Sequence, residues 1–418
     1  VYYYMLQSRL FTKTLRESPR DEAAANARLL IRAGFIHKEM AGVYSFLPLG
    51  FRVLKKIEGI IREEMNALGA NEVLLTALQD SSVWETSGRW DDQVIDVWFK
   101  TPLKSGSLLG LANTHEEAIT SLMRQYVSSY RDLPFSVYQI QTKFRNELRA
   151  RSGLLRGREF LMKDLYSFHL NTDDLDSFYE RVAAAYAKIF SRLDIGDITY
   201  QTFASGGAFS KYSHEFQTAT AAGEDLIHVC VDCRQAVNEE IKADLPACPA
   251  CGGSNFRRVT AIEVGNIFKL GTRFSEAANL TVTDTEGKNH FVIMGSYGLG
   301  LSRLMGALVE THHDDHGIIW PVAAAPFSVH LLSLGDDSAT VAAAGSLYQK
   351  LAAAGVTALF DDRLNVSVGA KLTDADLIGL PYRLIVSQKS GDRIEFKERA
   401  SAQSSLLTVS EVVGRLVS

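Results

Sequence analysis

The sequence predicts an α+β fold: an antiparallel sheet with flanking helices, a small insertion that carries four cysteines, and a C-terminal α/β domain. Before Pro326, helix and strand patterns mix without the regular alternation of a doubly wound parallel sheet. All four cysteines lie between positions 230 and 251. From Pro326 onward, strand and helix patterns alternate regularly, which predicts a separate α/β domain.

Length and composition limit the class of protein. A chain of 418 residues suggests two or three domains at about 150 residues each. We expect the main domain at 1–227 and 259–322, the cysteine insertion at 228–258 and the C-terminal domain at 323–418. No apolar run reaches the roughly 18 residues that a membrane span needs. The amino terminus, where Met5 is a candidate start, lacks the apolar core of a signal peptide, so we expect a cytoplasmic protein without a membrane partner.

Three segments of the main domain have helical periodicity. Asp21–Gly34 begins with acids and ends on glycine, as the helix dipole and a C-cap favour. In Gly50–Gly69 and in Leu175–Leu193, apolar residues recur at helical spacing. Runs rich in apolar, β-branched and aromatic residues predict the strands: Asn71–Leu78, Val94–Phe99, Ser107–Leu111, Phe135–Gln141, Phe160–Phe168 and Phe291–Met294.

The C-terminal domain reads as strand, helix, strand, helix, strand. The strands are predicted at SVHLLSL, VTALFDD and YRLIVSQ, and the helices at Ala339–Ala354 and near Gly369–Leu377. Alternation of this kind places helices against a sheet with parallel strands.

The densest charge lies in KFRNELRARSGLLRGREFLMKD, residues 143–164. This segment holds seven basic side chains and three carboxylates between two strand patterns, with a loop at Ser152 and Gly153. The planar fork of arginine suits phosphate oxygens and stays charged when partly desolvated. A solvated hairpin with surface ion pairs is the competing interpretation, and only the rest of the chain decides against it.

A glycine-rich motif at Met294–Glu310 runs from a strand pattern into an apolar helix, with Arg303 one turn past Gly300. Glycines there let the backbone approach a nucleotide closely, and a helix amino terminus favours anions. Close helix packing explains the same glycines, so the motif alone is weak evidence. Together with the arginine-rich hairpin it points to nucleotide binding.

The segment NTHEEAIT offers a carboxylate beside a hydroxyl. Thr114 is a candidate N-cap for the following helix, with Glu117 at the capping-box position. That arrangement leaves Glu116 available to bind an ammonium group through charge-assisted hydrogen bonds.

The cysteines form two C-x2-C pairs, Cys230 with Cys233 and Cys248 with Cys251. The spacing is close to that of a zinc ribbon, in which four thiolates fill the coordination of a structural Zn²⁺ and leave no position for water. A metal-free relic and two disulfides are the alternatives, and a reducing cytosol disfavours the disulfides.

Five motifs, in this order along the chain, resemble bacterial-type prolyl-tRNA synthetase, a class II aminoacyl-tRNA synthetase: THEE at 114–117, FRNE at 144–147, REFLMKDLYSF at 158–168, SHEF at 213–216 and GSYGLGLSR at 295–303. The similarity covers nearly the whole chain. It implies a class II catalytic sheet, a C-terminal anticodon-binding domain and a homodimer. It also implies that ATP with Mg²⁺ activates proline, which is then transferred to proline tRNA.

The resemblance assigns an ATP site. Arg145 matches the arginine that contacts the α-phosphate and the proline carboxylate, and it is an implied catalytic residue together with Arg303. Glu147 and Phe160 match the acid and the aromatic ring that bind adenine. Arg156 and Arg303 match positions that hold the far phosphates, and the glycines of the last motif that line the site are Gly298 and Gly300. No nucleophilic side chain is required, because the carboxylate attacks phosphorus directly and the protein supplies position and charge.

The resemblance also assigns a proline site. Thr114 and Glu116 match the Thr-x-Glu pair that grips the imino group, and similarity completes the pocket with Arg145, Met162, Asp164, Tyr166, Ser213 and His214. Three places depart from the family pattern, and we expect altered local geometry there. They are Thr76 in place of a proline, Ala150 and Ser152 in the hairpin loop, and a shifted double glycine in GGAFSKY before SHEF.

The segment between SHEF and GNIF is short, and the cysteine insertion fills most of it. It leaves no room for the large editing domain of many bacterial relatives, so we predict no editing of alanyl-tRNA in cis. Two alternatives remain: a paralogue that activates an amino acid for another acceptor, and a non-catalytic tRNA-binding regulator. The C-terminal domain, where Arg363 and Lys371 are candidate anticodon contacts, argues against the first, and the presence of Arg145 and Arg303 argues against the second.

Overall fold

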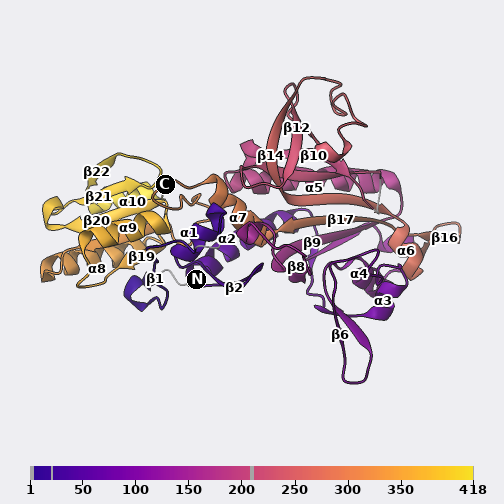
Figure 1. Ribbon diagram of the computed structural model, residues 1–418, viewed down its shortest axis with the longest axis horizontal. Helices are drawn as coiled ribbons and strands as arrows, with labels where there is room; N and C mark the ends of the chain where they lie inside the picture. The colour runs from indigo at the N-terminus through magenta and orange to yellow at the C-terminus, as the bar shows by residue number, and fades with distance from the viewer. Residues whose placement is uncertain (1–3, 20–21, 208–210, 418) are drawn as a thin grey trace. The chain divides into compact units, whose positions relative to one another are not determined.

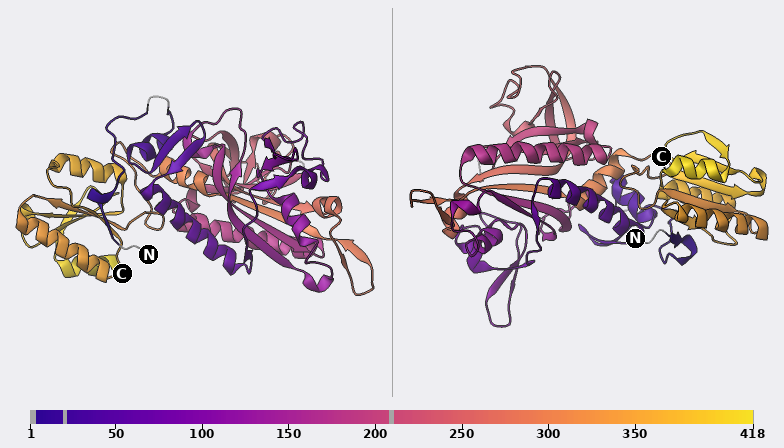
Figure 2. Two further views of the ribbon diagram at one scale, coloured as in Figure 1. Left: turned by 90° about the horizontal axis from the view of Figure 1, so that it is seen from below. Right: turned by 180° about the vertical axis from the view of Figure 1, so that it is seen from behind.

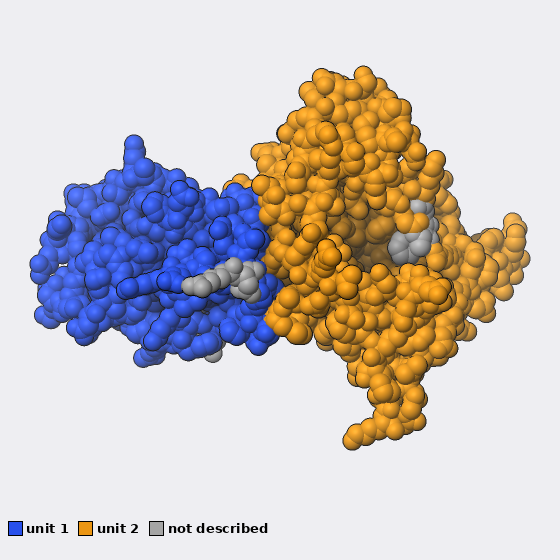
Figure 3. Space-filling model, in the orientation of Figure 1, with its two compact units in different colours: residues 1–39, 44–56, 308–418 blue, residues 40–43, 57–307 orange. Residues whose placement is uncertain are grey.

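The computed structural model describes residues 4–19, 22–207 and 211–417. The chain divides into two compact units, which Figure 3 colours separately. Unit 1 comprises 1–39, 44–56 and 308–418, and unit 2 comprises 40–43 and 57–307. Unit 1 therefore contains segments from both ends of the chain. Among the described residues, no helix is long and apolar enough to cross a bilayer.

Unit 2 is built on a mainly antiparallel sheet, as predicted (Figure 1). In the described residues its nine strands lie in the order β11, β10, β13, β12, β14, β17, β9, β8, β4, and β11 also pairs with β14. The β10–β13 and β4–β8 pairs are parallel. The strands are β4 (Asn71–Glu72), β8 (Phe135–Phe144), β9 (Glu159–His169), β10 (Thr199–Ser205), β11 (Tyr212–Ala219), β12 (Asp225–Cys230), β13 (Ala236–Asn238), β14 (Phe256–Gly271) and β17 (Ile293–Gly300).

The long helix α5 (Thr172–Arg192) lies along one face of this sheet (Figure 2). It begins where the Asn171 side chain accepts a hydrogen bond of 2.9 Å from the backbone N–H of Asp174, and acids occupy its first turn, which suits the positive end of the helix dipole. Phe178, Tyr186 and Ile189 are buried on its inner face.

The other face of the sheet carries α4 (Glu116–Met123) and α6 (Arg273–Ala278). Their apolar side chains share one core with residues of β8, β9 and β17, including Ile119, Phe168 and Phe274. Successive side chains of a strand point to opposite faces. In β9, therefore, Lys163 contacts Tyr186 of α5, whereas Tyr166 belongs to the core beneath α4.

Three predicted strands were wrong in part. Phe291–Met294 is divided between the last residue of β16 (Asn289–Phe291) and the start of β17, with Val292 outside both. Val94–Phe99 forms turns, and the strand β6 (Phe99–Pro102) begins at its last residue, because Trp98 packs edge-on against Trp84. Within Asn71–Leu78, only the first two residues form a strand, and Leu78 opens β5 (Leu78–Asp80). Between β4 and β5, side-chain amides bind the backbone in place of a neighbouring strand. Gln139 Oε1 accepts from Leu75 N at 2.9 Å, and Gln141 Nε2 donates to Leu75 O at 2.8 Å.

Smaller elements complete unit 2. The strand β7 (Leu108–Leu111) pairs with β5 and β6, and β15 (Thr281–Thr283) pairs with β16 (Asn289–Phe291). The short helix α3 (Ser81–Glu85) precedes the turns that lead to β6.

The C-terminal part of unit 1 has the alternating elements predicted from the sequence, and it adds elements that were not predicted. The chain's first strand, β1 (Tyr4–Leu6), pairs in parallel with β19, while β21 and β22 extend the opposite edge in antiparallel order. The sheet runs β1, β19 (Ala358–Asp361), β18 (Val329–Leu334), β20 (Tyr382–Ser387), β21 (Ile394–Glu398), β22 (Ser404–Leu407). Its helices are α8 (Ser338–Ala353), α9 (Val368–Ile378) and α10 (Val409–Val417).

Toward the amino terminus are α1 (Ala25–Arg32), β2 (Ile36–Met40), β3 (Val43–Phe46) and α2 (Pro48–Ala67). Helix α1 begins four residues after the predicted Asp21, and residue 21 lies outside the described residues. Helix α7 (Leu301–Thr311) follows directly on β17, as the glycine-rich motif predicts.

Candidate active site

Two cavities in unit 2 share a wall. The first, of about 30 Å³, lies between the β8–β9 hairpin and β14 and β17. The second, of about 360 Å³, opens toward α4 and the turns before β6. Arg145, at the end of β8, lines both cavities, and the other shared residues are Glu147, Met162, Asn266 and Gly298.

The first cavity collects the residues that the resemblance assigns to ATP. The antiparallel hairpin places Arg145 just after β8 and Phe160 on β9, and the Arg145 guanidinium carbon lies 5.3 Å from the centre of the Phe160 ring. At Gly298 an added Cβ would come within 2.9 Å of Asn266 Oδ1, so the glycine permits close strand approach. The assigned residues that line this cavity are Arg145, Glu147, Arg156, Phe160, Gly298, Gly300 and Arg303.

Two guanidinium groups at the first cavity have carboxylate partners, and burial disfavours the charge of the third. Arg156 NH2 lies 2.8 Å from Glu147, and its NH1 lies 3.0 Å from Glu224. Arg303 NH1 lies 3.1 Å from Glu263. Burial lowers the pKa of Arg145, and the nearby Arg303 lowers it further. Three guanidiniums that converge on one cavity suit a polyphosphate, which relieves the repulsion between Arg145 and Arg303.

A group of carboxyls lies beside these arginines, and sequence reasoning missed it. Gln217 Nε2 donates to Glu215 Oε2 and to Asp225 Oδ2, at 2.8 Å in both cases. Burial, with the neighbouring Glu263, raises the pKa of Glu215 to about 8. Glu263 also lines the first cavity. Carboxylates next to a phosphate site fit Mg²⁺, which binds one or two carboxylates together with phosphate oxygens.

The second cavity is lined by residues assigned to proline: Thr114, Glu116, Arg145, Met162, Asp164 and Tyr166. Thr114 Oγ1 donates to Glu116 Oε2 at 2.5 Å, and Ser296 Oγ donates to Glu116 Oε1 at 3.2 Å. The capping-box prediction is wrong, because α4 has His115 as its N-cap and that residue makes no side-chain cap. The Thr114 hydroxyl instead donates to a carboxylate, a charge-assisted bond stronger than a neutral cap.

The floor of the second cavity is a buried network around Asp164. Its carboxylate accepts from Lys143 Nζ at 2.7 Å, from Gln139 Nε2 at 2.9 Å and from the Tyr166 hydroxyl at 2.9 Å. Burial raises the pKa of Asp164, but the Lys143 charge and the hydrogen bonds from Gln139 and Lys143 contribute to a larger opposite effect, so the net shift is downward. The Asp164 carboxylate is therefore ionised and held in one orientation at the floor of the pocket.

Ser213 and His214 lie on β11, beside the cavities. Among the described residues, neither lines the first or the second cavity. The Ser213 hydroxyl donates to Ser205 O at 3.0 Å, and His214 Nδ1 lies 2.7 Å from the Tyr179 hydroxyl. The preceding loop, where a shifted double glycine was noted, includes residues 208–210, which lie outside the described residues.

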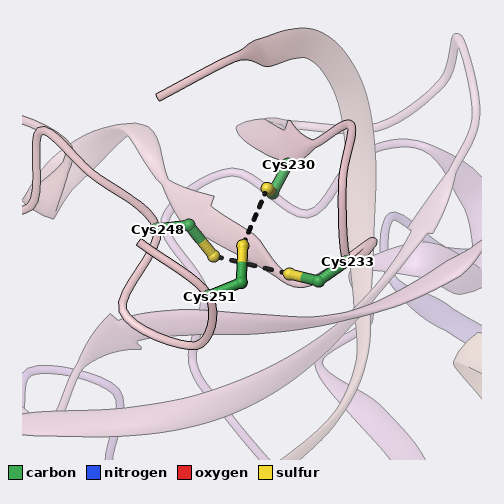
Figure 4. Close-up of side chains that lie close together, drawn as sticks. All are labelled: Cys230, Cys233, Cys248 and Cys251. Atoms are coloured by element: carbon green, nitrogen blue, oxygen red, sulfur yellow. Dashed lines mark hydrogen bonds between the residues drawn. The ribbon is translucent and has the colours of Figure 1, made fainter. Parts of the chain in front are cut away.

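The four cysteines come together at the tip of the insertion (Figure 4). Cys230 Sγ lies 3.6 Å from Cys251 Sγ, and Cys233 Sγ lies 3.5 Å from Cys248 Sγ. All four sulfur atoms lie within 4.8 Å of one another. Tetrahedral Zn²⁺ with bonds of about 2.3 Å sets its sulfurs about 3.8 Å apart. The donor set and spacing fit that ion.

Sequence reasoning also missed the partners that hold the assigned side chains. Arg89 follows α3 and lines the second cavity beside Glu116, yet no local pattern around it predicts a pocket residue. Lys143 lies just past the predicted strand Phe135–Gln141, and only its burial in the structure shows that it requires a charged partner. That partner, Asp164, is on the neighbouring strand.

Comparison with known proteins places this geometry in a family. The class II tRNA synthetase core domain (G, H, P, S and T) matches residues 98–312, and the anticodon binding domain matches residues 326–418. The proline-tRNA ligase of Rhizorhabdus wittichii is 39% identical over an alignment of 439 positions, covering 99% of this chain and 100% of the relative. That of Azorhizobium caulinodans is 40% identical over 442, again covering 99% and 100%.

The chain belongs to the proline-tRNA ligase family. The fold agrees: prolyl-tRNA synthetase from Cryptosporidium parvum, solved with L-proline and AMP, superposes with a TM-score of 0.76 at 16% identity over 93% of this chain and 73% of that one. A class II synthetase core and an anticodon-binding domain are therefore the two matched parts of this enzyme. The predicted fold class and family are confirmed.

Proposed function

We propose that this chain activates proline with ATP and Mg²⁺, forms prolyl-adenylate with release of pyrophosphate, and transfers the prolyl group to proline tRNA. The observation that carries the proposal is the shared wall of the two cavities, where Arg145 faces both. An amino acid held in the second cavity directs its carboxylate at an α-phosphate held in the first. Position and neutralisation of charge then supply the catalysis.

Each arginine of the first cavity takes a part in this reaction. Arg145 holds the proline carboxylate and the α-phosphate together, and Arg303, beside Gly300, binds the far phosphates. Arg156 joins them after ATP displaces it from Glu147 and Glu224, its present partners. Glu147, freed in this way, accepts from the adenine amino group while Phe160 stacks on the base. Glu263 and Glu215 would hold Mg²⁺, which would supply further charge neutralisation.

In the second cavity, Thr114 and Glu116 bind the imino group of proline. The Glu116 carboxylate is already oriented by Thr114 and Ser296, so it loses little conformational freedom when the substrate binds. Met162, Tyr166 and the Asp164 network shape the wall against the pyrrolidine ring. Within the part of the chain that the structure describes, Ser213 and His214 line neither cavity, and the family resemblance alone assigns them to the proline pocket.

Proline-dependent exchange between ATP and pyrophosphate tests the activation step. We expect exchange with proline at a higher specificity constant than with alanine or threonine. Folded protein that gives no exchange with proline would refute the proposal. Exchange without transfer to proline tRNA would favour a paralogue that charges another acceptor.

The four cysteines bind a structural Zn²⁺ in this proposal. Support comes from the sulfur spacing, since all four Sγ atoms lie within 4.8 Å of one another, as ligands of one tetrahedral ion do. Four thiolates leave no open position, so the ion stabilises the insertion and takes no part in catalysis. Metal analysis of purified protein tests this point.

The remaining proposals concern tRNA and the partner subunit. The insertion is too small for an editing domain, so deacylation of alanyl-tRNA by this chain is expected to be absent. The anticodon-binding domain binds proline tRNA, although the Arg363 fork is engaged by Asp361 and Asp374 and Lys371 Nζ donates to Ser333 O.

Leu74 and Leu78 are 75% and 55% exposed, and this apolar edge supports a homodimer, which light scattering tests.

A further inference from the structure

A buried arginine sits between two adjacent carboxylates at the edge of the amino-acid cavity. Arg89 NH1 lies 3.0 Å from Glu117 Oε1, 3.1 Å from Glu117 Oε2 and 3.4 Å from Glu116 Oε2. The side chains are 10% exposed for Arg89, 3% for Glu117 and 8% for Glu116. Arg89 and Glu116 line the second cavity, whereas Glu117 is not among the residues that line it.

The surroundings hold this arginine in one place. Its guanidinium carbon lies 5.2 Å from the Trp84 ring centre and 5.3 Å from that of Phe274. Trp98 Nε1 donates to the Arg89 carbonyl at 3.0 Å, and Ser87 Oγ donates to Glu117 Oε1 at 2.7 Å. Aromatic packing and hydrogen bonds therefore fix the guanidinium against Glu117, with Glu116 as its weaker neighbour.

We propose that Arg89 is a positioning residue that sets the charge of the amino-acid pocket: it neutralises Glu117 and leaves the Glu116 carboxylate for the substrate ammonium. This inference rests on the proposed binding of the imino group by Glu116. Two carboxylates without Arg89 would share a proton, and Arg89 without Glu117 would neutralise Glu116 itself. Either change weakens the pocket for a cationic group.

The ionisation of these groups supports the inference. Burial raises the pKa of Glu117 to about 7, and Arg89 opposes that rise. Burial by itself would lower the pKa of Arg89, but Glu116 and Glu117 raise it more, so the guanidinium stays charged. Other charged or titratable groups that act on Glu116 from the packed elements are His115, Lys143, Arg145 and Tyr166. Lys143 is paired with Asp164, while Arg145 and Tyr166 line the second cavity together with Arg89.

A double-mutant cycle tests the charge balance. ATP–pyrophosphate exchange is measured with Arg89→Met, Glu117→Gln and the double variant, between pH 6 and 9. We expect Glu117→Gln to raise the KM for proline about tenfold at unchanged KM for ATP, as the loss of a charge-assisted hydrogen bond predicts. The double variant has the net charge of the wild type and is expected to recover to within about threefold of it.

The pH profile separates this role from a structural one. In Arg89→Met, Glu117 loses the cation that opposes the rise of its pKa, so the carboxyl pair binds a proton more readily at low pH. The KM for proline should therefore be highest at pH 6 and fall as the pH rises, and Arg89→Lys should restore most of the wild-type profile. Asp314→Asn, which breaks a half-exposed arginine–carboxylate pair with Arg399 outside the cavity, is the control for loss of an ion pair and should leave the KM unchanged.

The outcomes are decisive in both directions. Recovery in the double variant supports the proposal, even where Arg89→Met alone folds poorly by thermal unfolding. A double variant as weak as the weaker single variant, or single variants whose KM for proline stays within twofold of wild type, would overturn it. If the wild type shows no proline-dependent exchange, the proposed function fails first, and this result is distinct from a failure of the cycle in an active enzyme.

Discussion

Replacement of Lys143 by methionine would remove the cation beneath the amino-acid cavity. Lys143 is 0% and Asp164 4% exposed, and their charged atoms are 2.7 Å apart. Methionine keeps the apolar stem but leaves Asp164 with Gln139 and Tyr166 as hydrogen-bond donors. Breaking a buried ion pair on one side costs about 3–5 kcal/mol. Because the two remaining donors stay in place, we expect a loss at the lower end, about 3 kcal/mol.

The loss should depend on pH in a defined direction. In the wild type the net shift of the Asp164 pKa is downward, so its contribution to stability is present above the unfolded pKa of about 3.9 and is lost as the pH falls through the folded pKa. In Lys143→Met, burial dominates and the folded pKa rises above the unfolded one. The variant therefore loses stability as the pH rises from about 4 through that value.

Differential scanning calorimetry at pH 5 and pH 8 measures both effects. A loss of about 3 kcal/mol lowers the Tm of a unit of this size by about 6–12 °C, and the deficit should be larger at pH 8. Lys143→Met/Asp164→Asn removes the uncompensated charge and should regain most of the loss. A deficit under about 2 °C at pH 8, or a double variant no more stable than the single one, would refute the reasoning.

Three further predictions follow from the site. In metal-free protein, Glu215→Gln should become more stable relative to wild type as the pH rises from 5 to 8. The wild-type carboxyl has a folded-state pKa raised to about 8, so the wild-type fold loses stability over that range, where the unfolded state ionises first. A Tm difference that does not vary with pH would contradict this. Chelation, followed by a Zn²⁺ dye, should release metal and lower the Tm, and Cys233→Ser should do the same; metal-free protein with an unchanged Tm would count against the zinc site. Thr114→Val removes a donor to Glu116 and should raise the KM for proline about tenfold in pyrophosphate exchange, whereas an equal rise for ATP would point to general disorder of the site.

Local patterns predicted most of the elements around the site. Periodicity placed α2, α5, β8, β9 and the β17–α7 junction to within a few residues, because burial of one face or stripe is written into the spacing of apolar residues. The strand prediction for Val94–Phe99 was wrong in part, because its apolar residues do not alternate between the two faces of a sheet. Ile95 and Val97 line the second cavity from turns, and residues that line a pocket follow no regular spacing in the sequence.

The sequence by itself determined the family, the antiparallel sheet, the cysteine cluster and the residues assigned to ATP and proline, because each of these depends on short contiguous motifs. Only the tertiary structure decided which charges meet. Arg89 with Glu117, Lys143 with Asp164 and Arg156 with Glu224 are pairs from separate segments, and strand register and packing choose such partners without a local signal. The tertiary structure also decided that the Thr114 hydroxyl donates to Glu116 and does not cap α4, since the carboxylate is the stronger acceptor within reach.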